Sequence, residues 1–443
     1  MSKGNVKGCS RFMKEDFLHY VWQHQYFNKE QLLTTTGEEI TILHPGFYNR
    51  SDAGPDFSSA RIKLDETEWV GSVEIHLSSS DWRRHHHQRD AKYNQVVLHV
   101  VWQEDEVALR EEGTPMPTLE LQGRVQLPLQ AQYQELLWSE AVIPCAPQTH
   151  LVDGIYKSSM LDKTLLERLQ LKAELVLERM EQSRQNWEST VYQTMAAGFG
   201  FKMNQDGFLF LTQVLPWGMV QRYQKKPAQL EALVFGQAGL LSHITAPDEY
   251  ALQLAKEHHF LSHKHALEEP LTAKAWNMLR LRPANFPGIR LGQFLAVLLA
   301  HEHLWSTLVA CSTIKEFKEF FQQEPPAYWQ QHYAPGKKCK QTFARIGEES
   351  IQNLLINVVA PLFIAYSRRT GDYFYQGKAI ALLEQIPKEN NKITRLYTGL
   401  GFANKSAADS QALIGLYQRY CQPKKCLNCV VGHRLMKQHL TRP

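Results

Sequence analysis

The chain has 443 residues, of which 43% are hydrophobic and 21% are charged, and its formal net charge is +4. This composition is that of an ordinary globular protein, and the length predicts two domains. No run of eighteen apolar residues occurs, and the N-terminal segment lacks the apolar centre of a signal peptide. We therefore expect a cytoplasmic protein without membrane association, whose oligomeric state the sequence leaves open.

The first third of the chain alternates between helical and strand patterns. Apolar spacing of three and four residues indicates helices, and apolar-polar alternation indicates half-buried strands. The run V-V-L-H-V-V-W lacks alternation, which suits a central strand covered on both faces. In chain order we expect a helix at 12–27, strands at 39–43, 60–64 and 69–77, a helix at 80–93, a strand at 96–102 and a hairpin within 107–125.

Helical periodicity dominates from about residue 157 onward, with breaks at prolines such as Pro216. The predicted fold class is therefore α+β. We expect an N-terminal domain at 12–150 with the order α-β-β-β-α-β. A large all-helical domain at 151–443 is expected to end in a cysteine-rich tail.

Acidic and imidazole side chains gather around two neighbouring predicted strands. Side chains alternate along a strand, so Glu74 and His76 share one face of 69–77. Asp56 precedes the strand at 60–64 and is expected to approach Glu74 across the sheet. Two converging carboxylates make an oxygen-rich site for Mg or Mn, with the imidazole as third ligand or as base.

This arrangement resembles the restriction-endonuclease-like nuclease superfamily, whose signature is PD...(D/E)-x-K. Pro55-Asp56 and Glu74-Ile75-His76 stand at the two motif positions. The resemblance implies a metal-dependent nuclease in which Asp56 and Glu74 bind the metal. His76 stands where the superfamily has lysine, and Lys63 is expected to supply the missing charge, with Glu15 as an extra acid.

Two functional readings remain open at this stage. The first is a nuclease that hydrolyses DNA or RNA, and the second is a catalytically inactive scaffold of the same fold that binds nucleic acid or a protein. In an alternative without a metal, Asp56 caps a turn and Glu74 pairs with Arg61 or Lys63 across the sheet.

The chain as a whole resembles an uncharacterised bacterial family known only as a domain of unknown function. Segments that carry this resemblance include G-P-D-F-S-S-A-R-I, G-S-V-E-I-H-L-S-S-S-D-W and L-R-P-A-N-F-P-G-I-R-L. The resemblance implies no activity.

The C-terminal stretch Y-C-Q-P-K-K-C-L-N-C-V-V-G-H predicts a second metal site. Cys421, Cys426 and Cys429 have the spacing C-x4-C-x2-C, and either His433 or the upstream Cys145 is expected to be the fourth ligand. The spacing favours zinc over an iron-sulfur cluster, although one upstream and three C-terminal cysteines also occur in some iron-sulfur nucleases that this chain resembles. From residue 411 to the end there are six Lys or Arg and no Asp or Glu, which suits a nucleic-acid backbone.

Two further groups of histidines are assigned structural roles. Successive residues of a helix point about 100° apart, so the run His85-His86-His87 is expected to lie on a solvated or phosphate-facing helix surface. His99, within the apolar strand at 96–102, is expected to be a core histidine.

Overall fold

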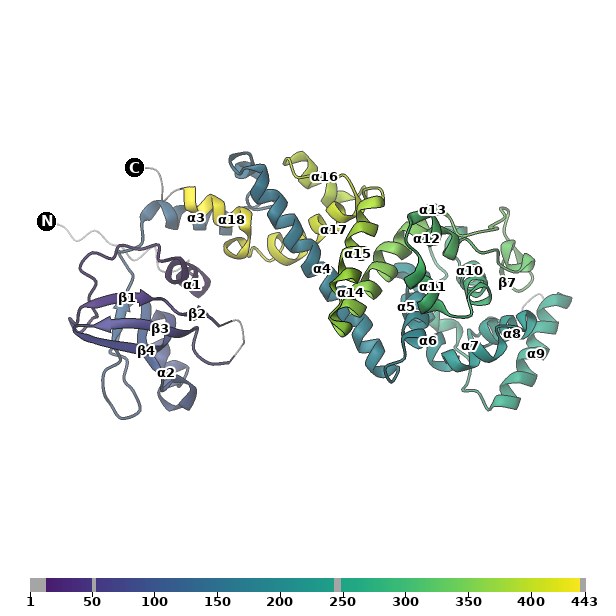
Figure 1. Cartoon of the computed structure of the whole chain (residues 1–443), viewed down its shortest axis with the longest axis horizontal. Helices are drawn as coiled ribbons and strands as arrows, with labels where there is room; N and C mark the ends of the chain where they lie inside the picture. Colours follow the sequence, from purple (N-terminus) through teal and green to yellow (C-terminus); the bar gives the residue numbers. More distant parts are fainter. Residues whose placement is uncertain (1–12, 50–52, 243–247, 439–443) are drawn as a thin grey trace. The chain divides into compact units, whose positions relative to one another are not determined.

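The computed structural model describes residues 13–49, 53–242 and 248–438, and its fold is mixed α+β (Figure 1). The described residues fall into two compact units. Unit 1 comprises those within Met1–Met160, Tyr397–Phe402 and Leu416–Pro443, and unit 2 those within Leu161–Leu396 and Ala403–Gly415. The predicted α+β class is confirmed. The sequence assigned the C-terminal cysteines to the second domain, whereas the structure places them in unit 1.

Unit 1 contains the sheet, and its strands follow the predicted order. The first helix begins later than expected, and residue 12 lies outside the described part of the chain. The elements are α1 (Glu15–His24), β1 (Ile40–His44), β2 (Phe47–Tyr48), β3 (Phe57–Leu64), β4 (Thr67–Ser78), α2 (Asp81–Arg84), η2 (His87–Arg89), η3 (Ala91–Tyr93), β5 (Val96–Gln103), β6 (Thr118–Glu120), α3 (Leu127–Trp138) and η4 (Ala146–Leu151).

The strand order in the sheet is β1-β3-β4-β5-β6, with β2 paired to β3. Strands β1, β3 and β4 pair antiparallel, whereas β5 is parallel to β4 and β6 is parallel to β5. Every residue of β5 is buried except its last, as expected for a strand covered on both faces. The hairpin expected within 107–125 is present only as a short antiparallel bridge between Leu109 and Pro115, and the strand that follows, β6, joins β5 in parallel.

The predicted helix at 80–93 is interrupted. Helix α2 ends at Arg84, and two short 3-10 turns follow it. His86 has left-handed backbone angles (φ 60°, ψ 28°), which an α-helix cannot contain. The turn at His86 redirects the chain, and this change matters for the site described below. Helices α1 and α2 both pack on β4.

Unit 2 is helical except for one small hairpin of β7 (His332–Ala334) and β8 (Lys337–Lys338), so the expectation of an all-helical domain needs this correction. Helix α4 (Gly154–Gln182) begins in unit 1 and continues into unit 2. The other helices of unit 2 are α5 (Trp187–Phe199), α6 (Phe201–Val214), α7 (Trp217–Tyr223), α8 (Pro227–Gln237), α9 (Glu249–His265), η5 (Ala273–Ala275), η6 (Pro283–Asn285), α10 (Pro287–Ala300), α11 (Leu304–Ala310), α12 (Ile314–Phe321), η7 (Ala327–Gln330), α13 (Glu348–Leu354), η8 (Leu355–Val359), α14 (Ala360–Thr370), α15 (Tyr373–Gln385), α16 (Lys392–Gly399, which runs on into unit 1) and α17 (Ala407–Leu416).

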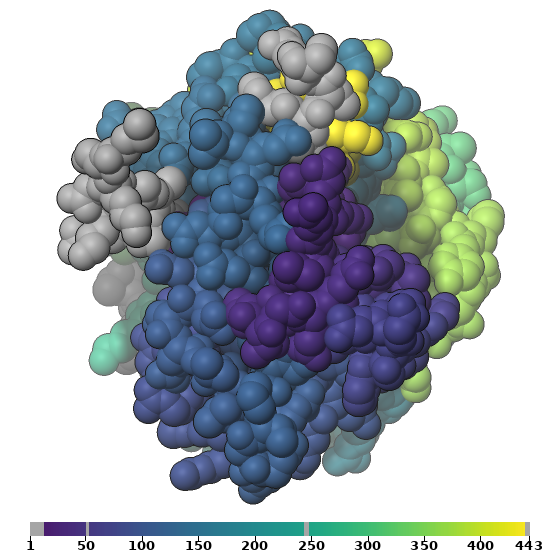
Figure 2. Space-filling view, turned by 90° about the vertical axis from the view of Figure 1, so that its left-hand side faces the viewer, coloured from purple at the N-terminus to yellow at the C-terminus, as the bar shows by residue number. Residues whose placement is uncertain are grey.

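The chain ends within unit 1. The last elements are η9 (Tyr417–Cys421), η10 (Cys426–Asn428) and α18 (Val430–Gln438). Helix α18 packs against α3 and η4, so the end of the described chain lies on a segment some 300 residues earlier. The space-filling view of unit 1 shows yellow C-terminal atoms against blue segments of the first third of the chain (Figure 2).

One continuous helical stretch, Glu348–Thr370, is long and apolar enough to cross a membrane by length and composition. Of its most apolar window, 72% is buried inside the protein, as in the core helix of a globular domain. A π-helical turn, η8, lies within it.

Candidate active site

Asp56 and Glu74 meet where β3 begins. Phe57, the first residue of β3, pairs with Val73 of β4, so Asp56 comes level with Glu74. The Asp56 backbone N–H donates to Glu74 Oε2 over 3.1 Å, and Asp56 Oδ2 accepts from the Ile75 N–H over 2.9 Å. The pairing of the two strands therefore brings the two predicted acids together.

The carboxyl group of Glu74 is buried among imidazoles. Its Oε1 lies 3.6 Å from His76 Nε2 and 3.4 Å from His87 Nε2. Burial and, second to it, the adjacent Asp56 carboxylate raise the pKa of Glu74. A cation bound here would favour the ionised form of the Glu74 carboxyl group.

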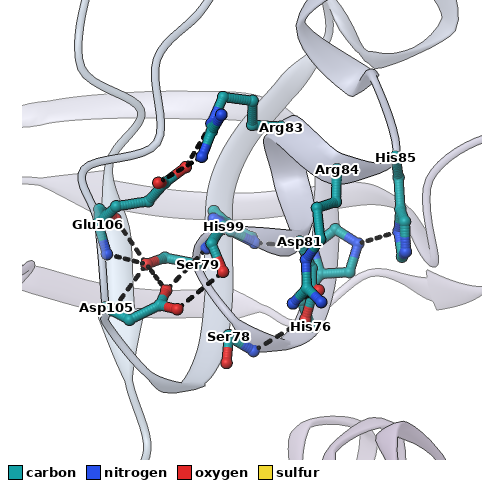
Figure 3. Close-up of polar contacts among 11 residues, drawn as sticks. His76, Ser78, Ser79, Asp81, Arg83, Arg84, His85, His99, Asp105 and Glu106 are labelled. Atoms are coloured by element: carbon teal, nitrogen blue, oxygen red, sulfur yellow. Dashed lines mark hydrogen bonds and ion pairs between the residues drawn. The ribbon is translucent and has the colours of Figure 1, made fainter.

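His76 lies at the centre of a chain of imidazoles (Figure 3). Its Nε2 is 3.2 Å from His85 Nδ1, and its Nδ1 is 2.9 Å from His99 Nε2. The ligand atoms of His76, His85 and His87 all lie within 4.8 Å of one another. His99 is fully buried behind this group, on the neighbouring strand β5.

The backbone turn at His86 explains how His85 and His87 reach the same point. Because the helix has ended and His86 is left-handed, His85 and His87 turn toward His76 while His86 stays exposed. The expected solvated helix surface is therefore wrong for the buried His87, whereas His85 is exposed at the end of α2. The sequence signal for this arrangement is the spacing of His85 and His87, two residues apart. Side chains at that spacing share a face in an extended segment but not in a helix, and a helix was expected here.

The imidazoles of His76, His87 and His99 are held in their neutral form. Burial and, second to it, the surrounding histidines together lower the pKa of His76 to about 2. Burial likewise lowers the pKa of His87 to about 4 and that of His99 to about 3. Neutral imidazole is the form that binds metal ions, so the cluster is prepared for that role.

Hydrogen bonds and an ion pair fix the position of α2 and hence of His85 (Figure 3). Asp105 accepts hydrogen bonds from the hydroxyl groups of Ser79 (3.0 Å) and Ser80 (2.7 Å) and from the Ser80 N–H (2.9 Å). Arg83 donates two parallel hydrogen bonds to Glu106, at 2.8 and 2.9 Å. Together these contacts tie both ends of the short helix to the loop that follows β5.

Helix α1 adds a second acid-imidazole pair on the other side of Asp56. His19 Nε2 lies 3.2 Å from Asp56 Oδ2, and Glu15 stands one helical turn before it. Burial lowers the pKa of His19, but the Asp56 and Glu15 carboxylates raise it by more, so the net shift is upward. Burial raises the pKa of Glu15. The sequence named Glu15 but gave no signal for His19.

A cavity of about 320 Å³ within unit 1 is lined in part by His19. The Tyr48 ring, which contacts the His19 ring with centroids 5.6 Å apart, forms part of its wall. Lys14 and the adjacent Lys424 and Lys425 also line it. Positive charge and aromatic surface thus lie beside His19. We call His19 with Glu15, Asp56, Glu74, His76, His85 and His87 the acid-imidazole group.

Lys63 lies away from this site. It pairs with Glu68 at the opposite end of the β3–β4 hairpin, and its Nζ forms an ion pair with Glu66 at 3.0 Å. Arg61 pairs with Glu68 at 2.6 Å. The structure therefore does not bring Lys63 to the two acids, and it corrects the alternative in which Glu74 pairs with Arg61 or Lys63.

Residues 15–392 match the family described as "Protein of unknown function (DUF2851)". The chain belongs to this family. The DUF2851 match includes α1, the whole sheet and all residues of the acid-imidazole group, and it extends through most of unit 2. No curated protein and no solved structure matches the chain.

The three C-terminal cysteines lie beyond the residues matched to DUF2851, and they gather with Cys145 in unit 1. Burial and, second to it, the neighbouring Cys429 and Cys426 together raise the pKa of Cys145 to about 12. His433 is engaged elsewhere, because its Nδ1 lies 3.0 Å from the Tyr20 hydroxyl on α1. Of the two expected fourth ligands, the structure thus places Cys145 nearer to the cysteines.

Proposed function

We propose that this protein is a metal-dependent hydrolase of nucleic-acid phosphodiesters, with Glu74, His76, His85 and His87 as the metal ligands. The observation that carries the proposal is the spacing of the four ligand atoms. The pairs His76 Nε2–His85 Nδ1, His87 Nε2–Glu74 Oε1 and His76 Nε2–Glu74 Oε1 are 3.2, 3.4 and 3.6 Å apart.

Four ligands bound tetrahedrally at about 2.0–2.1 Å would be separated by about 3.3 Å. These three separations are close to that value, and the ligand atoms of His76, His85 and His87 all lie within 4.8 Å of one another, so a modest closing of the group would surround one ion. A single carboxylate with three imidazoles is the donor set of a borderline transition metal, not of Mg. Of the two metals expected from the sequence, Mn therefore fits better than Mg, and Zn, Fe, Co and Ni fit equally well.

The contacts of His76 support its role as a ligand. A metal-bound imidazole donates its second N–H to a neighbouring acceptor, which fixes its tautomer and orientation. His99 Nε2 is such an acceptor for His76 Nδ1 at 2.9 Å. The N–H of His99 is then on its Nδ1, a fully buried atom that has no hydrogen-bond partner among the described residues.

Because four protein ligands complete a tetrahedral ion, a catalytic water would be a fifth ligand, whose pKa the ion would lower while it stabilises negative charge on the phosphate. Asp56 and His19 stand beside the ligand group and are not among its members. His19, whose pKa is raised by Asp56, is suited to accept a proton from the attacking water. In this assignment His19 is the base, whereas the sequence had suggested His76 for that role and Lys63 as a supporting charge.

A nucleic-acid substrate is supported by the cavity beside His19. Three lysines there, Lys14, Lys424 and Lys425, would bind phosphate groups, and the Tyr48 ring offers a surface on which a base stacks. Resemblance to the nuclease superfamily at Pro55-Asp56 and Glu74 points to the same class of substrate.

The test is cleavage of labelled single- and double-stranded DNA and RNA in the presence of Mn, Zn, Co or Mg. Loss of a residue that only supports a metal ligand costs about 10–100-fold in metal affinity or activity. Glu74→Gln and His85→Ala change a ligand itself, so we expect each variant to lose more than about 100-fold in cleavage rate. Glu68→Gln, on the same strand, and His86→Ala, on the same turn, are matched controls that should keep full activity.

Equal cleavage by all variants would mean that a contaminant cuts, and the proposal would fail. In a different outcome, the wild type binds these substrates without cutting them, with a Kd that Lys424→Ala increases. That result would replace the hydrolase proposal with the hypothesis of an inactive nucleic-acid-binding scaffold.

A further inference from the structure

Four cysteines of unit 1 stand at the ends of four short elements that pack on one another. Cys421 ends η9, Cys426 begins η10, Cys429 directly precedes α18, and Cys145 directly precedes η4. Element η10 contacts both η9 and α18, and α18 in turn contacts η4. A chain of contacts thus connects the C-terminal cysteines to the one that lies some 280 residues earlier in the sequence.

Specific contacts hold the C-terminal loop against the earlier segment. The Lys424 ammonium donates to the Leu137 carbonyl at 2.8 Å, and the Gln438 side chain donates to the Leu151 carbonyl at 2.8 Å. Gly432 lies so close to Cys426 that a Cβ there would be 2.0 Å from the Cys426 carbonyl oxygen. The loop that contains Cys426 and Cys429 is therefore closely packed.

The surroundings of the thiols suit bound metal better than isolated thiols. Cys145, Cys421 and Cys429 are each less than 9% exposed. The buried Tyr397 hydroxyl donates a hydrogen bond to Cys421 Sγ at 3.0 Å, a contact of the kind that stabilises a metal-bound thiolate. Thiolates gathered in one buried region repel one another, and a cationic centre among them offsets that repulsion.

The spacing of the sulfur atoms bears on which metal they bind. Around one zinc ion with bonds of about 2.3 Å, thiolate sulfurs are separated by about 3.8 Å. Within the described part of the chain, the ligand atoms of His76, His85 and His87 all lie within 4.8 Å of one another. In the same part of the chain, no three of the four cysteine sulfurs lie that close together. The sulfurs are therefore spaced more widely than a single ion requires.

We propose that Cys145, Cys421, Cys426 and Cys429 bind an iron-sulfur cluster, which fastens the C-terminal loop to unit 1. A four-iron cluster takes four cysteine thiolates and is larger than one ion, which fits both the number and the spacing of these sulfurs. The loop that it fastens, Pro423–Asn428, lines the cavity beside His19. This centre does not depend on the proposed hydrolase activity, because none of its ligands belongs to the acid-imidazole group.

The test is the content of iron, acid-labile sulfide and zinc in the full chain, purified without oxygen and also after reconstitution with iron and sulfide. We expect about four iron and four sulfide per chain, with visible charge-transfer absorption. Cys145→Ser and Cys426→Ser should lose the iron and the absorption. Cys311→Ser, which changes a buried thiol of unit 2, and His433→Ala should keep both.

Stoichiometric zinc without sulfide would overturn the cluster, as would a wild-type chain that takes up neither metal after reconstitution. Iron that survives in Cys145→Ser but is lost in His433→Ala would overturn the ligand set. The wild-type metal content decides the question even if a cysteine variant fails to fold. Mn binding at the acid-imidazole group is measured in the same preparations. It tests the proposed hydrolase site by itself, so the failure of one proposal can be told from the failure of the other.

Discussion

His99 Nε2 lies 2.9 Å from Nδ1 of His76, and both are buried side chains of the neighbouring strands β5 and β4. Parallel pairing places Glu74 opposite His99 and His76 opposite Val101, so a residue of the central strand supports the side chain that faces the site. The sheet itself thereby fixes the orientation of His76. The first prediction follows from this contact.

Replacing His99 with Phe should weaken metal binding without removing a ligand. The ring volume is kept, but His76 loses the acceptor that holds its orientation, and such losses cost about 10–100-fold in metal affinity. The measurement is calorimetric titration of the purified protein with Mn or Zn. His86→Phe serves as the control because His86 is exposed on the adjacent turn. Unchanged affinity in His99→Phe would show that His76 is not oriented through His99.

Lys63 provides the second prediction. It lies seven residues from Asp56 along an extended strand, roughly 20 Å away, and forms an exposed ion pair with Glu66. Lys63→Ala should leave both metal binding and cleavage unchanged, and it should change the free energy of unfolding by less than about 1 kcal/mol. Side-by-side assays with Glu74→Gln test this. A large loss of activity in Lys63→Ala would restore the role that the sequence suggested for Lys63.

The strands of unit 1 could be predicted because their patterns are local. Alternating side chains gave β3 and β4, and the apolar run of β5 indicated a strand buried on both faces. The hydrogen bonds that join Asp56 and Glu74 follow from strand pairing, which is why these two acids could be suspected from the sequence.

The rest of the site depends on contacts that no local pattern encodes. His87 reaches Glu74 only because the chain turns at His86, and the sequence alone favoured a continuous helix there. His19 comes from α1, and its approach to Asp56 depends on how that helix packs on the sheet. Tertiary packing therefore added His19, His85 and His87 to a site that the sequence had outlined with two acids and His76.

Trp82 carries the third prediction, because it anchors the helix that precedes His85. Its side chain is 2% exposed, packs with Val96, Ala108 and Met116, and donates its indole N–H to the Leu109 carbonyl at 3.0 Å. Trp82→Ala should cost about 3–5 kcal/mol of unfolding free energy, and Trp82→Phe should cost less because most of the packing is kept. Urea denaturation of the three proteins measures this.

If α2 positions His85 and His87, then Trp82→Phe should also lower Mn affinity while unit 2 remains folded. Circular dichroism under the titration conditions would check that the variant is folded. A Trp82→Phe protein with wild-type stability and a weakened metal site would separate positioning from folding, whereas equal stability and equal affinity would contradict the role of Trp82.

Lys172 gives the last prediction, which concerns unit 2 and is independent of both proposed metal sites. Its ammonium donates to Asn357 Oδ1 and Gln411 Oε1, each at 2.8 Å. Burial and, second to it, the charge of Arg168 lower the pKa of Lys172 from 10.5 to about 7, with Glu389 partly offsetting these two effects. Between pH 7 and 10.5 the unfolded chain therefore binds more protons here than the folded chain does.

The sign of the effect on stability follows from that difference. The unfolding free energy rises with pH wherever the unfolded state binds more protons, so Lys172 should destabilise unit 2 fully below pH 7 and progressively less up to pH 10.5. Comparing wild type with Lys172→Met by urea denaturation at pH 6.5 and pH 9 isolates this residue from other titrating groups. We expect stability to increase more from the lower to the higher pH in the wild type than in the variant. Equal increases in the two proteins would show that Lys172 titrates alike in the folded and unfolded states.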